Sequence, residues 1–392
     1  MIGSTTESCK NEPRMEFDIH GVIGIRLVDP SSADVTGVRH QLGSLQLPLL
    51  HEPDITVRFV KRLSPPHLRY LGPKQRGFSD DAFFILDQSS NRAMARIPFE
   101  LVGGPCELVC ERGLGSVPLL MPILSLTALA KGFVAVHASA FVHHGIGILM
   151  AGWAGSGKTT ALLGFASEGA EFVGDEWILL SGDGQTMCGL PKEIELSPSH
   201  LEITLATRLA INRSRLRALE GLRSVSRMQD LLGEKVNGTH AASALRKVTS
   251  AAQRRVLPKI SPNVIFGSRV GSLVAKLGKV FLLISQDDPW VEVQPTPPTE
   301  MARRVAHLAH YEQAGFMEHY LAFKFAFPEK KNTFIEESSK LQYALLSRAL
   351  MAKETYTVRH PYPLAFSALY EAMKPFCEST KNEQNVAVCA LP

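Results

Sequence analysis

The sequence predicts an α/β protein in which a smaller β-rich N-terminal domain precedes a larger domain with a mixed sheet. Short apolar runs broken by turn residues continue to about residue 115, which is typical of strands. Between residues 146 and 180, a buried strand, a glycine loop, a helix and a second strand follow one another. Residues 300–350 have the apolar spacing of helices. Together these patterns indicate the α/β class.

Composition and breaks in the pattern predict four segments. Residues 1–14 are polar and are expected to form a disordered tail, followed by the β-rich domain at 15–115. Residues 116–377 are expected to form the larger domain, and residues 378–392 a second tail. With 392 residues, of which 45% are hydrophobic and 20% charged, the chain has enough apolar surface for two cores.

The individual elements follow from periodicity and turn residues. In the first domain the expected strands include 22–27, 55–60 and 82–86, with turns at 29–32 and 64–66. The apolar run 117–130 contains two prolines and is shorter than the ~20 residues of a membrane span, so it predicts a core helix. Further expected elements are strands at 146–151, 171–180 and 280–284, a helix at 159–168 ended by Gly169, a turn at 360–363 and a last helix before residue 377.

Residues 152–159 match the phosphate-loop pattern G-x-x-x-x-G-K-[ST] in full, with a predicted strand before it and a predicted helix after it. Glycines let backbone N–H groups approach a phosphate, and the helix N-terminus adds favourable potential. Lys158 is expected to reach the β- and γ-phosphates of ATP, and Thr159 to bind Mg²⁺. The flanking elements disfavour a chance glycine turn. The predicted nucleotide-binding residues are Gly152, Trp153, Ala154, Gly155, Ser156, Gly157, Lys158, Thr159 and Thr160.

Two adjacent acids, Asp175 and Glu176, lie in the strand that follows this helix. Side chains alternate along a strand, so the two point to opposite faces unless the strand bends. Acids that enter a sheet beside a phosphate loop bind Mg²⁺, orient a nucleophile, or do both. The loop predicts nucleotide binding, and the two acids predict Mg²⁺ binding or catalysis at the bound nucleotide.

The run from His137 through the loop and Gly169 to Asp175 and Glu176 resembles the catalytic core of the HPr kinase/phosphorylase family. That family shares a nucleotide fold with phosphoenolpyruvate carboxykinases, and the resemblance covers residues 137–180, with looser similarity beyond. It implies that Asp175 is the general base for a serine-type hydroxyl. It also implies that Glu176 assists with Mg²⁺ and that His137 lines the phosphate site.

The chain departs from the family pattern at two points. Glu176 stands where the family has a second Asp, and the glycine-rich segment associated with the reverse, phosphorolytic reaction has no counterpart here. These departures argue against HPr as the acceptor and against phosphorylase activity. The resemblance therefore extends to the broader set of HPr-kinase-related proteins, some of which modify peptides.

Each candidate residue also has a simpler interpretation. Asp175 could be only the Mg²⁺ ligand of a generic nucleotide hydrolase. Glu176 could be an exposed strand residue, and His137 a core histidine whose hydrogen bonds are satisfied. The sequence leaves these alternatives open.

The stretch 208–259 differs from the rest, with 12 Lys/Arg against 3 Asp/Glu, and predicts a basic helical insertion. It lacks aromatic residues that would stack on bases, and the whole chain has a net charge of only +4, so nucleic acid is not the expected partner. Arg254, Arg255 and Lys259 are candidates to bring a cation to a transferred phosphoryl group, although ordinary surface roles are the simpler interpretation of all three.

Six scattered cysteines form no zinc-binding set, and the polar N-terminus has no apolar segment typical of a signal peptide. A reducing cytoplasm without membrane attachment is the expected location.

The expected function is ATP- and Mg²⁺-dependent transfer of the γ-phosphoryl group to a hydroxyl of a protein, peptide or small molecule. A nucleotide-binding regulatory module and a simple ATPase are the alternatives from other functional classes. The acceptor is not identified by the sequence, which also leaves open whether the chain forms a homo-oligomer.

Overall fold

The computed structural model is a mixed α/β protein and describes residues 14–43, 47–72, 75–87, 90, 92–196, 259–361, 366–378 and 387–390. The chain forms two compact units. The first combines Met1–Ala135 with Ala309–Leu346, and the second combines Val136–Leu308 with Ser347–Pro392. Residues 116–135 and 309–346, which the sequence analysis assigned to the larger domain, thus belong to the first unit.

The first unit contains an eight-stranded mixed sheet with the order β1-β2-β3-β8-β7-β6-β5-β4. Strands β2, β3 and β8 pair in parallel, and the remaining pairs are antiparallel. Its strands are β1 (Arg14–Ile19), β2 (Ile23–Val28), β3 (Ile55–Val60), β4 (Arg69–Leu71), β5 (Arg76–Phe78), β6 (Phe83–Leu86), β7 (Ala93–Arg96) and β8 (Cys106–Glu111). The strands expected at 22–27, 55–60 and 82–86 correspond to β2, β3 and β6.

The turn expected at 29–32 is instead the start of a helix, α1 (Ser32–Leu42). Ser31 caps it: its hydroxyl accepts a hydrogen bond from the Asp34 backbone N–H, and the Asp34 carboxylate accepts one from the Ser31 backbone N–H. This reciprocal pair satisfies two of the unpaired N–H groups at a helix start. Pro30 and Ser31 therefore precede a helix that begins at Ser32.

Aromatic side chains hold α9 (Ala314–Ala326) in the first unit. Phe99 belongs to the short 3₁₀ helix η1 (Phe99–Leu101). The centroid of its ring lies 5.2 Å from that of Phe316 and 5.3 Å from that of Phe323, both in α9, and 5.4 Å from that of Phe83 in β6. Such tilted and edge-on pairs add to the apolar burial of large rings. The other helices associated with this unit are α2 (Leu120–Ala130), which confirms the expected core helix, and α10 (Thr333–Leu350).

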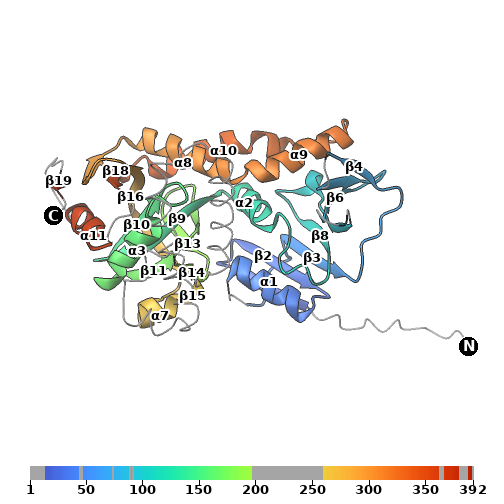
Figure 1. The fold of residues 1–392 in the computed structure, drawn as a ribbon, viewed down its shortest axis with the longest axis horizontal. Helices are drawn as coiled ribbons and strands as arrows, with labels where there is room; N and C mark the ends of the chain where they lie inside the picture. Colours follow the sequence, from blue (N-terminus) through green and yellow to red (C-terminus); the bar gives the residue numbers. More distant parts are fainter. Residues whose placement is uncertain are drawn as a thin grey trace, which may run out of the picture. The chain divides into compact units, whose positions relative to one another are not determined.

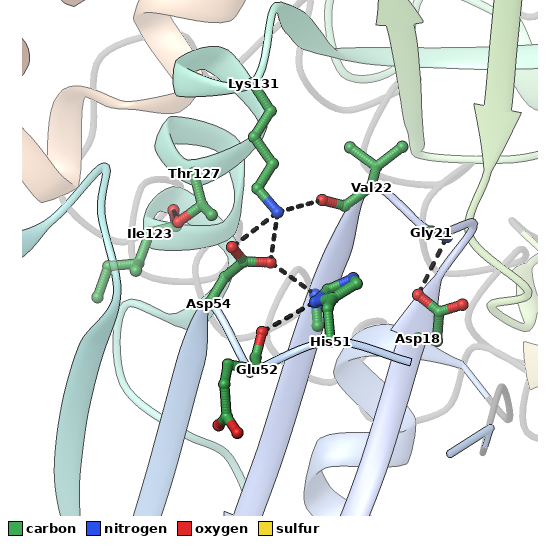
Figure 2. Close-up of polar contacts among 10 residues, drawn as sticks. Asp18, Gly21, Val22, His51, Glu52, Asp54, Ile123, Thr127 and Lys131 are labelled. Carbon is green, nitrogen blue, oxygen red and sulfur yellow. Dashed lines mark hydrogen bonds and ion pairs between the residues drawn. The ribbon is translucent and has the colours of Figure 1, made fainter. Parts of the chain in front are cut away.

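Lys131 joins the end of α2 to the sheet of the first unit. Figure 2 shows its ammonium group between the backbone oxygen of Val22, at 2.8 Å, and the Asp54 carboxylate, at 2.7 Å. Asp54 also accepts a 2.8 Å hydrogen bond from the backbone N–H of Gly24. One carboxylate therefore connects the beginning of β2, the beginning of β3 and the end of α2.

The second unit contains a nine-stranded mixed sheet whose main path is β10-β9-β12-β13-β16-β18-β17-β19, with β11 paired to β9 and β10 also paired to β16. Two further short strands, β14 (Ile194–Glu195) and β15 (Lys259–Ile260), pair with each other. The nine strands are β9 (Phe133–His143), β10 (Ile146–Ala151), β11 (Glu171–Gly174), β12 (Trp177–Ser181), β13 (Thr186–Gly189), β16 (Val274–Gln286), β17 (Trp290–Pro295), β18 (Glu354–Pro361) and β19 (Ala387–Ala390).

Three parallel neighbours, β10, β16 and β18, form the centre of this sheet. Helices α3 (Lys158–Ser167) and α11 (Phe366–Cys377) pack against each other (Figure 1). Phe165 of α3 contacts Tyr370 of α11, with their ring centroids 4.9 Å apart. The remaining elements are α7 (Pro262–Phe266), the short 3₁₀ helix η3 (Gly267–Arg269) and α8 (Pro298–Glu312). Because parallel strands end at one edge, the carboxyl ends of β10, β16 and β18 converge there.

Several sequence predictions meet a different outcome or cannot be tested. The strand expected at 171–180 is interrupted after Gly174, and β19 lies within the expected C-terminal tail. Arg14, expected at the end of the N-terminal tail, begins β1, whereas residues 1–13 lie outside the described part of the chain. The basic stretch 208–259 lies outside it too, except Lys259. Within the described residues, no helix combines the length and apolar character needed to cross a bilayer.

Candidate functional site

A glycine loop, residues 152–157, joins the carboxyl end of β10 to the start of α3. Gly157, with φ +87°, precedes the helix in a left-handed conformation that favours glycine. A Cβ atom at Gly152 would lie 2.3 Å from the Ser156 hydroxyl and 2.9 Å from the Leu283 backbone oxygen of β16. Both positions therefore require glycine for the loop to close against the neighbouring strand.

Lys158, the first residue of α3, folds its side chain back into the glycine loop. Its Nζ atom donates 2.8 Å hydrogen bonds to the backbone oxygens of Gly152 and Trp153, and the residue is 6% exposed. The ammonium group thus lies inside the curve of the loop, where it would be within reach of an anion held by the loop backbone.

His360, in β18, packs against the same loop from the sheet. Its Nε2 atom lies 2.9 Å from the Ser156 backbone oxygen and its Nδ1 atom 2.8 Å from that of Pro361. Both partners are acceptors, and a neutral imidazole has one N–H, so the tautomer decides which of the two carbonyl oxygens receives the hydrogen bond. A Cβ atom at Gly157 would lie 3.2 Å from this ring. The histidine is 1% exposed and acts as a support for the loop.

Sequence reasoning assigned His360 to a turn and did not connect it with the loop, so its role was missed. The structure places it in β18, whose carboxyl end lies beside that of β16. A signal existed: a histidine near the end of a strand, at the edge where α/β sheets bind ligands, is a candidate site residue.

The two acids lie in a tight turn, which we call the acid turn, residues 175–177, between β11 and β12. The Trp177 N–H donates a 3.0 Å hydrogen bond to the Asp175 oxygen across Glu176, whose φ is +72°. This is the geometry of a classic γ-turn, which is rare and strained for a residue with a side chain. The turn supplies the bend that breaks strict strand alternation at the two acids.

Asp175 points into the protein and is 4% exposed. Its carboxylate accepts hydrogen bonds from the Ser139 hydroxyl, at 2.5 Å, and from the Thr159 hydroxyl, at 3.1 Å. Burial raises the pKa of this carboxyl, and the negative charge of Glu176 raises it further, against the opposing effects of the two hydroxyls and Lys158. Asp175 is therefore a carboxylate with increased proton affinity beside the first turn of α3.

Glu176 is less buried and forms an ion pair with Lys192 in the segment that follows β13. Two glycines bring this segment close: a Cβ atom at Gly189 would lie 1.9 Å from the Val173 backbone oxygen and 2.8 Å from the Cα atom of Gly174. The backbones of the β11 and β13 ends thus touch where side chains would prevent it.

His137 lies in β9 and stacks on Trp177, with ring centroids 6.0 Å apart and planes inclined by 18°. Ser139 lies two residues further along β9 and so on the same face of the strand. The backbone N–H of Ala138, between them, donates a 3.1 Å hydrogen bond to the Glu176 oxygen. Strand β9 thereby positions the acid turn. Ser139, a residue of β9 that sequence reasoning missed, contacts Asp175 directly.

The structure joins Lys158, Thr159 and Asp175 and adds Ser139, Lys192 and His360 to them. Of the cations proposed from sequence, Arg254 and Arg255 lie outside the described residues, and the Lys259 Nζ atom lies 3.8 Å from the Glu195 carboxylate, across β14 and β15. Trp153 is 52% exposed, and Thr160 is buried within α3. In the described part of the chain, no three His, Cys, Asp or Glu side chains gather into a metal-binding group.

No model of a protein family matches the chain, and no curated protein matches it. The class that the structure itself defines is a mixed α/β protein with a glycine loop at the carboxyl ends of parallel strands. The function is therefore inferred from the geometry of the site.

Proposed function

We propose that this protein is an ATP- and Mg²⁺-dependent kinase that transfers the γ-phosphoryl group to a hydroxyl of a protein, peptide or small molecule, and that it is related to HPr-kinase-like proteins. The observation that carries the proposal is the 3.1 Å hydrogen bond from the hydroxyl of Thr159, the residue after Lys158, to the Asp175 carboxylate. It combines a phosphate-loop motif with a buried carboxylate at the edge where α/β sheets bind ligands.

In this proposal the backbone N–H groups of the glycine loop and the ammonium group of Lys158 bind the phosphates of ATP. The acceptor oxygen forms a bond to the γ-phosphorus, the bond to the β–γ bridging oxygen breaks, and ADP leaves with that electron pair. The proton of the acceptor hydroxyl passes to the Asp175 carboxylate. The raised pKa of Asp175 favours this role, because a more basic carboxylate takes up a proton more readily.

The donor set fits Mg²⁺, which prefers oxygen ligands and takes only one or two carboxylates from the protein together with substrate phosphates and water. The hydroxyl of Thr159 and the adjacent Asp175 carboxylate are such oxygens. Glu176, for which the resemblance implied help with Mg²⁺, forms an ion pair with Lys192. When bound, the ion would neutralise charge on the β- and γ-phosphates.

The same contact also supports a second candidate. A carboxylate that accepts a hydrogen bond from the loop threonine is placed as a Mg²⁺ ligand would be, and an ATPase or nucleotide-dependent regulator needs no more than this. The two candidates differ in whether an acceptor receives the phosphoryl group.

The test is transfer of radiolabel from [γ-³²P]ATP and Mg²⁺ into the components of a cell lysate, with the Lys158→Met protein as the control. A kinase labels an acceptor in a manner that needs Lys158. Release of labelled phosphate at the same rate with and without acceptors would favour the ATPase instead. No binding of ATP at all would exclude both candidates.

A further inference from the structure

Lys192 is a lysine at the candidate site to which the sequence assigned no role. Its Nζ atom forms an ion pair with Glu176, and its side chain is only 15% exposed. A lysine withdrawn from solvent to this extent loses hydration, and the pairing with a carboxylate compensates for it. The arrangement keeps one positive charge beside the acid turn.

The position of Lys192 is built into the backbone. The close approach of Gly189 to Val173 and Gly174 brings the end of β13 against the acid turn, and the Leu190 N–H donates a 3.4 Å hydrogen bond to the Trp177 oxygen. Lys192 follows two residues later. The segment therefore contacts the acid turn and the end of β11 at Gly189, Leu190 and Lys192.

Glu176 presents its carboxylate from a strained conformation, with φ +72°. A glycine would adopt this conformation without strain, so a side chain here is retained at a cost in stability. Strain of this kind persists where the surrounding structure supports it, and it gathers at functional sites. Among the described residues, the Glu176 carboxylate accepts a hydrogen bond from Lys192 and forms an ion pair with it.

We propose that Lys192 is the cation that contacts the transferred phosphoryl group, and that Glu176 is the positioning residue that holds it beside Asp175. The inference rests on the proposed kinase function. Phosphoryl transfer spreads negative charge over the equatorial oxygens of the γ-phosphoryl group, and a positive group placed there beforehand lowers the barrier. Lys158 acts from the loop side, and Lys192 acts from the acid side.

A lysine suits this role because its ammonium group is a compact charge on a flexible four-carbon stem. It can leave Glu176 for the phosphoryl oxygens without movement of the backbone. The proposal assigns Glu176 to Lys192 in place of the Mg²⁺ role predicted for it from sequence.

The test measures the dissociation constants of MgADP and of MgADP with aluminium fluoride, which imitates the transferred phosphoryl group. It needs no acceptor. The variants are Lys192→Met, Lys192→Arg and Glu176→Gln. The matched control is Lys330→Met, which removes a lysine paired with Glu100 at 3.2 Å in the first unit. Thermal unfolding of each variant shows whether it is folded.

The Lys192→Met protein is expected to bind the aluminium fluoride complex about tenfold more weakly or worse, with the affinity for MgADP within about twofold of the wild type, because only the interaction with the transferred group is lost. Lys192→Arg, which keeps the charge, should recover part of the affinity. If Lys192→Met does not fold, Glu176→Gln, which removes the charge that holds Lys192 in place, serves instead. Glu176→Gln should weaken only the aluminium fluoride complex, with no added effect in the Lys192→Met background.

Equal loss of MgADP and aluminium fluoride affinity, or no loss of either, in the folded Lys192→Met protein, or in Glu176→Gln where Lys192→Met does not fold, would overturn the inference and leave the proposed function standing. A wild-type protein that does not bind MgADP would overturn the proposed function, and the inference with it. These two failures are distinguished by the wild-type measurement alone.

Discussion

The hydroxyl of Thr159 donates a 3.1 Å hydrogen bond to the Oδ2 atom of Asp175, and this bond joins the first turn of α3 to the acid turn. Ser139 of β9 reaches the other carboxylate oxygen. A strand, a helix start and a turn thus meet at one buried carboxylate. The predictions below depend on this arrangement and on the glycine loop beside it.

Replacement of Lys158 by Met should weaken ATP binding by at least about tenfold, because hydrogen bonds from a charged group contribute about 1.5–3 kcal/mol. The side chain keeps its length and loses its charge. Isothermal titration with ATP and Mg²⁺ measures the change. An unaltered affinity would show that the loop does not hold the phosphates.

Replacement of Asp175 by Asn should stabilise the folded protein at neutral pH. Burial raises the folded-state pKa of Asp175, so the folded state binds its proton more tightly than the unfolded state, and stability falls as the pH rises from the unfolded pKa to the folded pKa. Asn has no such titration. The melting temperature of the variant, measured without nucleotide, should therefore exceed that of the wild type by a margin that grows as the pH increases from about 4 and then levels off.

The Ser139→Ala protein is the control for that measurement. It keeps the carboxyl of Asp175 and removes one of the hydrogen bonds that favour its charged form, so the pH-dependent loss of stability should become larger. If the Ser139→Ala and Asp175→Asn proteins had identical melting temperatures at every pH, the titration of buried Asp175 would not be the source of the pH-dependent loss of stability.

Replacement of His360 by Ala should weaken ATP binding roughly fivefold, since it removes a hydrogen bond of ~1 kcal/mol that supports the Ser156 backbone. His360→Gln keeps a side-chain N–H that can donate to the same oxygen and should recover part of the affinity. The comparison of these two affinities is the measurement. Ala and Gln variants with equal affinities would mean that the hydrogen bond does not organise the loop.

Replacement of Gly189 by Ala should destabilise the protein by about 3 kcal/mol, because the new methyl group would meet the Val173 oxygen at 1.9 Å and force the backbones apart. Gly271 is the matched control in the same unit, since a Cβ atom there has open space around it and its backbone is not left-handed. Urea unfolding measures both. If the two substitutions cost the same, the close approach of β11 and β13 is not as tight as described.

Replacement of Lys131 by Met should destabilise the protein by roughly 1–3 kcal/mol, because the Asp54 carboxylate and the Val22 oxygen lose their partner. These residues belong to the first unit, and the glycine loop belongs to the second. ATP affinity should therefore stay unchanged at temperatures where the variant is folded. A loss of affinity there would mean that the cluster of Figure 2 takes part in nucleotide binding.

Local patterns predicted many elements of the fold well. The strand at 146–151 and the core helix within 117–130 are where the apolar periodicity places them, and the strand at 280–284 lies within β16. The helix α1 was missed because Pro30 and two serines were interpreted as a turn, although Ser31 and Asp34 have the spacing of a capping box. Strand pairing of distant segments, such as β10 with β16, depends on tertiary contacts that local periodicity does not contain.

The candidate site was predicted in part for the same reason. Lys158, Thr159 and Asp175 lie in one continuous stretch of α/β pattern, so a motif and its spacing were sufficient to connect them. His360 comes from a strand about two hundred residues away in sequence, and Lys192 is brought in by the contact of two glycine backbones. No local signal indicates the contact of Lys192, and the signal for His360 becomes readable only once its strand is known to end at the ligand-binding edge of the sheet. The bend at Glu176 could not be predicted from the sequence either, because its backbone has a positive φ, which residues other than glycine rarely adopt.

The central claim is that the Asp175 carboxylate accepts the proton of an acceptor hydroxyl beside bound ATP. The most direct measurement is the rate of γ-phosphoryl transfer by Asp175→Asn, set against its dissociation constant for ATP in the same buffer. The account predicts that transfer falls by at least about a hundredfold, as for the loss of a general base, with ATP affinity nearly unchanged. Transfer at the wild-type rate by this variant would contradict it.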